Sequence, residues 1–108
     1  MQLSTAIREG ARRSAPLHHT SHQSLLRSEQ GRLLSDAFGA AALAVALSPD
    51  ELTQQEVFPL LATFPELTTR VRSPAIIGWA SIQECILSCI TQGWSRERIA
   101  DWVEAQGC

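Results

Sequence analysis

The spacing of apolar residues predicts a short amphipathic helix near the start of the chain, over about residues 4–13. Its apolar face is formed by Leu3, Ala6 and Ile7. Ser4 is available to cap the first turn, and Gly10 weakens the far end. Residues 14–24 are rich in serine and histidine and contain a proline, which predicts an irregular loop.

The segment after this loop becomes apolar on all sides over residues 32–47, which predicts a helix in the protein interior. Two capping signatures follow, one at Ser48 and one at Thr53, and the next helix begins at one of them. Pro65 ends that helix, and residues 65–74 are expected to form a polar connection.

Residues 75–92 are the most apolar part of the chain and predict a largely buried helix. One face would carry Ile76, Trp79, Ala80, Ile86, Leu87 and Ile90, and the other Ile77, Ile82 and Cys89. Gly93 is placed to end this helix, and Ser95 is placed to cap the last one. Trp94 and Ile99 occupy the two positions of a hydrophobic staple.

No segment alternates apolar and polar residues between hairpin turns, so the pattern predicts no substantial sheet. We therefore expect an all-α protein, a compact bundle of four to six helices that forms a single domain over residues 1–108. Its last two helices would meet in a helix-turn-helix-like corner over residues 85–104. Between Pro74 and Gln106 we expect two helices, packed by tryptophan and isoleucine without a bound ion.

Composition is that of an ordinary globular chain, because 44% of the residues are apolar and 19% are charged. Three cysteines without paired spacing argue against a secreted disulfide scaffold. The start of the chain lacks the apolar region of a signal peptide, and the longest apolar run is too short to span a bilayer. We expect a cytoplasmic protein with no membrane partner.

Charge is divided unevenly along the chain. Residues 1–35 carry five arginines against two glutamates, a balance of +3, whereas residues 36–108 carry four arginines against nine acids, a balance of −5. Arg8, Arg12 and Arg13 would form a stripe on the first helix, suited to phosphates or to an acidic protein surface. The alternative is an ordinary solvated face.

The predicted corner is a candidate for DNA binding. Its last helix would expose Ser95, Arg96, Glu97, Ala100 and Asp101. Arg96 and Arg98 could then contact a phosphate or a guanine, although the same helix also carries three acids. The alternative is a corner that only closes the hydrophobic core.

The acidic part of the chain suggests a different partner. Its candidate partner-binding residues are Glu84, Glu97, Asp101 and Glu104. Carboxylates in this arrangement could imitate a phosphate backbone and occupy an arginine- and lysine-lined channel of a host complex.

Two further groups of residues are candidate metal ligands or nucleophiles. His18, His19 and His22 lie close in sequence, but no cysteine or carboxylate nearby completes a zinc site, so a solvated loop is the expectation. Cys85 and Cys89 are expected to be buried thiols that serve as small apolar side chains. We expect no metal and no cofactor, and no catalytic motif is present.

Both ends of the chain resemble small phage- and prophage-encoded proteins of proteobacteria. The similar stretches are "LSTAIREG" at 3–10, "DAFGAAALA" at 36–44 and "WSRERIADWVE" at 94–104. Those proteins open with L-S-x-A-I-R-x-G and close with W-[ST]-R-E-x-I-A-D-W-V-E. They also carry C-P-x-C and two histidines, a plausible zinc site. Here Ser73 and Ile76 stand at the cysteine positions, and Leu87 and Gln92 near the histidine positions, so all four ligands are absent.

The resemblance implies a phage context but no particular activity. Our leading hypothesis is a non-enzymatic interaction protein that inhibits a host complex, with a nucleic-acid-guided defence (CRISPR-type) complex as the natural target. The alternative is a protein that binds DNA or single strands through Arg8, Arg12, Arg13, Arg96 and Arg98. The sequence leaves open the oligomeric state, the choice between a protein and a nucleic-acid target, and the order of the loop from His18 to His22.

Overall fold

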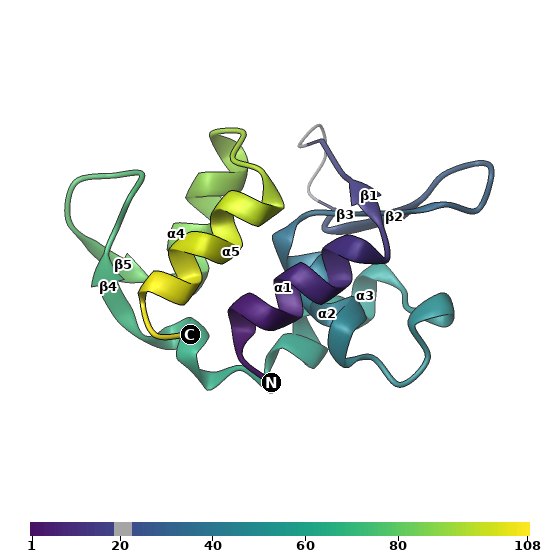
Figure 1. Ribbon diagram of the computed structural model, residues 1–108, viewed down its shortest axis with the longest axis horizontal. Helices are drawn as coiled ribbons and strands as arrows, with labels where there is room; N and C mark the ends of the chain where they lie inside the picture. The colour runs from purple at the N-terminus through teal and green to yellow at the C-terminus, as the bar shows by residue number, and fades with distance from the viewer. Residues whose placement is uncertain (19–22) are drawn as a thin grey trace.

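Five α-helices and two small β-sheets make up the computed structural model, which describes residues 1–18 and 23–108 (Figure 1). The expectation of an all-α protein is therefore wrong. Each strand has only two or three residues, too few for a period of two to be recognised in the sequence. The radius of gyration is 12.9 Å, close to the value of about 13 Å for a folded domain of this length.

Helix α1 (Leu3–Arg12) confirms the amphipathic helix predicted at the N-terminus, with Leu3, Ala6 and Ile7 fully buried. Gln2 rather than Ser4 occupies the N-cap position. Ser4 lies buried inside the helix, and its hydroxyl has no hydrogen-bond partner among the described residues. The helix packs against α2 (Ala37–Val45) and α5 (Arg96–Ala105), so it belongs to the core.

The first sheet has three strands in the order β1-β3-β2. Strand β1 (Ala15–Pro16) pairs parallel with β3 (Leu33–Ser35), and β2 (Leu25–Arg27) pairs antiparallel with β3. Two expectations are corrected here. The region 14–24 contributes a strand, and the helix expected over 32–47 is shorter, because β3 precedes it. Residues 19–22, which include His19 and His22, lie outside the described part of the chain.

Asp36 is the N-cap of α2, and its carboxylate accepts a hydrogen bond from the Gly39 backbone N–H at 2.9 Å. Residues 37–43 are all buried, as the apolar composition of this segment predicted. Small side chains bring neighbouring segments close. A Cβ at Gly10 would lie 1.6 Å from the Ala40 carbonyl oxygen, so α1 and α2 are in backbone contact at this point.

The middle of the chain contains short helical turns on both sides of α3 (Gln54–Leu61). Of the two predicted starts, Thr53 begins the α-helix and forms a capping box with Glu56. Ser48 precedes only a 3-10 turn, η1 (Pro49–Glu51), and makes no side-chain cap bond. The expected polar connection contains a second 3-10 turn, η2 (Pro65–Thr68), and strand β4 (Arg70–Arg72).

The largest correction concerns the helix expected over residues 75–92. Strand β5 (Trp79–Ser81) pairs antiparallel with β4, and helix α4 (Ile82–Thr91) starts only after it. Ser81 caps α4 and forms a capping box with Glu84. This S-x-x-E signature was present in the sequence and would have located the start of the helix. A strand therefore lies in the region where two helices alone were expected.

The turn between α4 and α5 has the glycine and the capping serine at the predicted positions. Gly93 has a φ of +86° and follows α4, a conformation that glycine adopts without a steric penalty. The Ser95 hydroxyl accepts a hydrogen bond from the Arg98 backbone N–H at 3.1 Å and so caps α5. Across the described residues, no helix has the length and apolar character needed to cross a bilayer.

Candidate functional site

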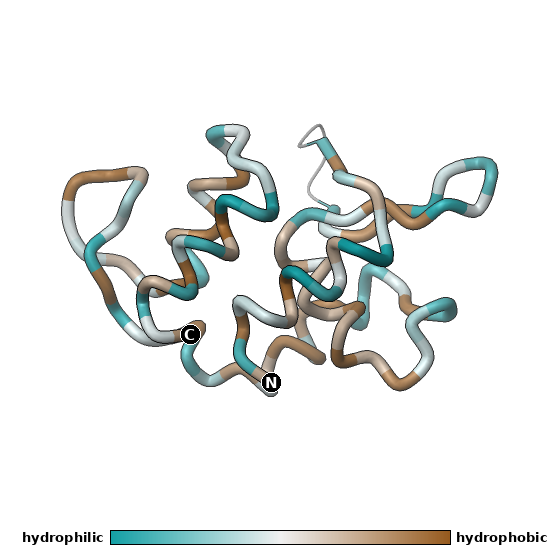
Figure 2. Tube along the Cα trace, in the orientation of Figure 1, coloured by the Kyte–Doolittle hydropathy of each residue, from teal (hydrophilic) through white to brown (hydrophobic). Residues whose placement is uncertain are grey.

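The β4–β5 hairpin exposes three large apolar residues, all of which were expected in the interior. Ile76 is 53% exposed, Ile77 106% and Trp79 62%. The hairpin forms the left margin of the molecule in Figure 1, and Figure 2 shows the hydrophobic stretch at its tip. A cluster of exposed apolar side chains on one projecting element is typical of an interaction surface.

Strand register separates the two faces of the hairpin. Arg72 is paired with Trp79 and Arg70 with Ser81, while Val71 is paired with Ala80 between them. Directly paired residues of antiparallel strands point to the same face. Arg70, Arg72 and Trp79 therefore share the outer face, and Ala80, which is buried, marks the inner one.

Polar contacts hold the hairpin in place. The Arg70 guanidinium donates to the Trp79 carbonyl oxygen at 3.0 Å. At the tip, the Ser73 hydroxyl accepts hydrogen bonds from the Ala75 and Ile76 backbone N–H groups at 3.2 and 3.1 Å. The side-chain amide of Gln92, just after α4, donates to the Ala75 carbonyl oxygen at 3.1 Å. These bonds present the apolar tip to solvent in a defined geometry.

The hairpin itself is basic, because residues 70–81 contain two arginines and no acid. The pKa of Glu84, on the helix that follows the hairpin, is lowered by its hydrogen bonds to Ser81 and, to a smaller extent, by the charge of Arg70. That carboxylate accepts hydrogen bonds from the Ser81 backbone N–H and hydroxyl at 3.1 and 2.9 Å. Glu84 is thus occupied in capping α4.

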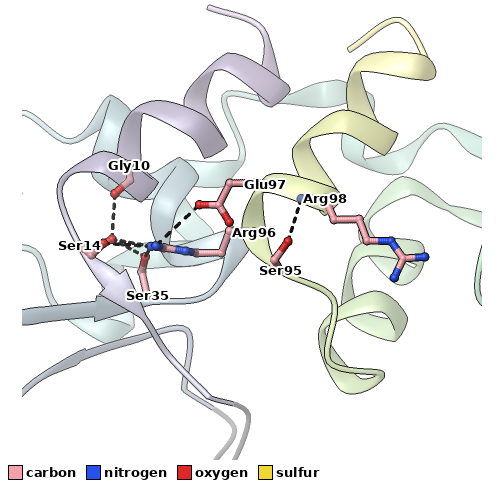
Figure 3. A network of polar contacts seen from close by, with 7 residues as sticks. All are labelled: Gly10, Ser14, Ser35, Ser95, Arg96, Glu97 and Arg98. Carbon is pink, nitrogen blue, oxygen red and sulfur yellow. Dashed lines mark hydrogen bonds and ion pairs between the residues drawn. The ribbon is translucent and has the colours of Figure 1, made fainter.

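Arg96, a proposed DNA-reading residue, lies in the interior. Only 8% of it is exposed, and its guanidinium reaches away from the outer surface of α5 (Figure 3). Its Nη1 donates to the Ser14 carbonyl oxygen and hydroxyl at 3.2 and 3.0 Å and to the Ser35 hydroxyl at 3.2 Å. Burial lowers its pKa, and the nearby charge of Glu97 partly opposes this effect. Arg96 therefore joins α5 to the turn after α1 and to β3.

The rest of the predicted recognition face is also changed by the fold. Ala100 is fully buried, and the Arg98 guanidinium stacks 3.6 Å above the Trp94 ring. Trp94 is partly buried against the core, and its ring also makes this cation–π contact. Glu97 and Asp101 remain exposed. The outer face of α5 is consequently acidic, which disfavours a phosphate backbone.

The predicted acidic group divides into two parts. Glu97, Asp101 and Glu104 follow one another at helical spacing on α5, whereas Glu84 lies on α4. Arg8 donates to the Asp101 carboxylate at 2.7 Å and to the Glu104 carboxylate at 3.0 Å. These two bonds raise the pKa of Arg8. Two of the three acids on α5 are therefore paired with a cation from the opposite end of the chain.

The predicted basic stripe on α1 is likewise divided. Arg8 faces α5, as described, and Arg12 forms an ion pair with Glu9 on its own helix. Arg13 is exposed just beyond the helix end. Of the other N-terminal arginines, Arg27 donates to the Asp50 carbonyl oxygen. The pairing of Arg8 with acids beyond residue 35 thus reduces the net basic charge expected from the first 35 residues.

Among the residues thought to hold a metal or act as nucleophiles, the two cysteines on α4 are buried and free, as predicted. Burial raises the pKa of the Cys85 thiol, and it raises that of Cys89 to about 11. Both are protonated near neutral pH and are poor nucleophiles. His18 lies exposed beside a cleft of about 400 Å³ that Asp36 and Arg96 also line. No group of three or more potential metal ligands occurs in the described part of the chain.

Comparison of the chain with protein-family models, with curated proteins and with solved structures gave no match. The positions suggested by the resemblance to phage proteins can still be located. Gln92 contacts the turn that contains Ser73 and Ile76, whereas Leu87 is half-exposed and lines a groove with Phe58. Two of these four positions therefore lie in the turn of the hairpin, and the third, Gln92, contacts that turn from the end of α4.

Proposed function

We propose that the protein is a non-enzymatic interaction protein that inhibits a complex of its bacterial host by docking through the β4–β5 hairpin. The observation that carries this proposal is the exposure of Trp79, Ile76 and Ile77 on a hairpin held by four hydrogen bonds. The resemblance of the two ends of the chain to phage-encoded proteins supports a host partner. A nucleic-acid-guided defence complex in the cytoplasm is the partner class that we expect.

The residue types on the hairpin are those that dominate binding at protein interfaces. Tryptophan and arginine are enriched among interface residues whose truncation costs about 2 kcal/mol or more. Here Trp79 and Arg72 are paired across the two strands. Because the hairpin is already ordered, little conformational freedom would be lost on binding. The acidic outer face of α5 would make a secondary contact with the partner. Glu97 is the acid on this face that does not bond Arg8.

The test uses cells in which a nucleic-acid-guided complex destroys a target plasmid. Expression of the wild-type chain is expected to restore plasmid transformation for at least one such complex. The double variant Ile77→Ser, Trp79→Ser should reduce this inhibition at least tenfold, because loss of one residue of this kind already weakens binding by about that factor.

Leu47→Ser is the matched control, because Leu47 is as exposed as Ile77 but lies between α2 and η1, away from the hairpin. It should inhibit as the wild type does. Retained inhibition by the double variant, or the absence of inhibition for every complex tested, would contradict the proposed function.

A further inference from the structure

Strand β4 has an open edge. The hydrogen-bonded pairs of the hairpin include Thr69 with Ile82 and Ser73 with Gly78, whose backbone groups are joined at 2.9 Å in both cases. Hydrogen-bonded and non-hydrogen-bonded pairs alternate in an antiparallel ladder, so the N–H and C=O groups of Arg70 and Arg72 point away from β5. Among the described residues, no donor or acceptor meets these four groups.

The opposite edge of the hairpin is short and partly occupied. On β5, the Trp79 carbonyl accepts a hydrogen bond from the Arg70 guanidinium, and the Ser81 N–H donates to the Glu84 carboxylate. Helix α4 begins directly after Ser81 and ends the strand. Strand addition is therefore open on one side of this sheet and hindered on the other.

We infer that β4 pairs with an extended segment of a partner protein that carries acidic residues at alternate positions. This inference rests on the proposed function, because it specifies what the hairpin docks against. An added antiparallel strand would satisfy the four outward backbone groups of β4. One acidic side chain would lie opposite Arg72 on the outer face, and a second would lie opposite Arg70, whose guanidinium would exchange the Trp79 carbonyl oxygen for this carboxylate. The residue between the two acids would be apolar and lie beside Val71.

Charge repulsion disfavours a second copy of this chain as the strand that pairs with β4. Antiparallel pairing of two β4 strands about Val71 would place Arg70 of one copy opposite Arg72 of the other. Like charges in directly opposite positions destabilise a strand pair. A nucleic acid also matches the edge poorly, since phosphate oxygens accept hydrogen bonds but cannot donate to the two open carbonyl groups. A peptide backbone offers both donors and acceptors.

The probe is a capped seven-residue peptide of alternating valine and glutamate, titrated into the 15N-labelled full chain. Binding is expected with Kd on the order of 1 mM or tighter, since only a few backbone hydrogen bonds and two charge pairs are formed. The amide signals of Arg70 and Arg72 should shift most. N-methylation of the peptide amides that face β4 should abolish the shifts, because those amides supply the donors.

Charge reversal supplies a second criterion. Arg72→Glu should weaken binding of the glutamate peptide at least fivefold and allow the corresponding lysine peptide to bind. Arg32→Glu is the matched control, because Arg32 is exposed on the loop between β2 and β3, and it should bind the glutamate peptide like the wild type. The NMR spectrum of each variant reports at once whether the fold is intact.

The inference is overturned if no saturable shift occurs up to about 10 mM peptide, or if the N-methylated peptide binds equally well. It is also overturned if β4 signals respond instead to protein concentration, which indicates a second copy, or to a DNA duplex in a salt-dependent manner. If the peptide does not bind but the double variant Ile77→Ser, Trp79→Ser still loses inhibition, the strand-pairing inference fails and the proposed function stands. If the peptide binds but the double variant inhibits as well as the wild type, the proposed function fails instead.

Discussion

Arg96 illustrates how a single residue changes role between sequence and structure. Its position near the start of the last helix, next to a glycine turn, made it a candidate for contact with DNA. In the folded protein the same position points its side chain across the turn after α1, where Ser14 and Ser35 supply acceptors. This buried charge is held by hydrogen bonds to neutral oxygens and lies 4.0 Å from the Glu97 carboxylate, so its removal takes away both a hydrogen-bond donor and a counter-charge.

The residue-scale prediction compares Arg96→Met with Arg98→Met. The first should reduce the free energy of unfolding by about 2–3 kcal/mol, because it removes charge-assisted hydrogen bonds from a buried site. The second should cost less than about 1 kcal/mol, because Arg98 is exposed and makes one cation–π contact. Urea unfolding followed by circular dichroism measures both values. Equal effects of the two substitutions would show that Arg96 does not join α5 to the turn after α1 and to β3.

At the scale of the elements, the beginnings of helices carried more information than the apolar runs. The apolar run over residues 75–92 favoured one continuous helix, but Ser81 and Glu84 start α4 in its middle, and the residues before them form β5. Ile76 and Ile77 belong to the turn of a hairpin, so their apolar character does not report burial. Periodicity over so short a segment cannot distinguish the two cases.

The element-scale prediction concerns two serines that both match a capping signature. Ser81→Ala should destabilise the protein by about 1 kcal/mol, because the Ser81 hydroxyl accepts a hydrogen bond from the Glu84 backbone N–H at 3.1 Å. Ser48→Ala should change stability by less than about 0.5 kcal/mol, because Ser48 is exposed and makes no cap bond. Thermal unfolding of the two variants distinguishes them, and the opposite order would contradict the assignment of the cap.

At the scale of the whole molecule, the two ends of the chain are joined. Arg8 on α1 bonds Asp101 and Glu104 on α5, and the Ser4 N–H donates to the Cys108 carbonyl oxygen at 3.2 Å. One cation from the basic N-terminal part is therefore paired with two acids from the acidic C-terminal part within the fold. Helix α1, which carries Arg8, packs closely on α2 at Gly10.

The prediction at this scale tests that packing. Gly10→Ala should destabilise the protein by about 3 kcal/mol or more, because the added methyl group would overlap the Ala40 backbone and force α1 away from α2. Thr5→Ala is the control on the same helix, since Thr5 is exposed, and should change stability by less than about 0.5 kcal/mol. Denaturant titration measures both. A tolerated alanine at position 10 would mean that α1 does not pack on α2 in this way.

By itself, the sequence determined the features that depend on neighbours a few residues away. These are the amphipathic N-terminal helix, the glycine turn at Gly93, the cap at Ser95 and the burial of Cys85 and Cys89 on a helix, although not the start of that helix. Each follows from local capping, backbone conformation or helical periodicity, which are readable along the chain.

Only the tertiary structure decided which short segments pair as strands, which arginines are buried or neutralised, and which apolar residues remain outside. The pairs of β4 with β5 and of β1 with β3, and the contacts of Arg8 and Arg96, join positions that are separated along the chain and meet only on folding. Strand formation in segments of two or three residues depends on such partners rather than on intrinsic preference. The candidate site became visible for the same reason, because the hairpin exposes side chains whose composition alone favours the interior.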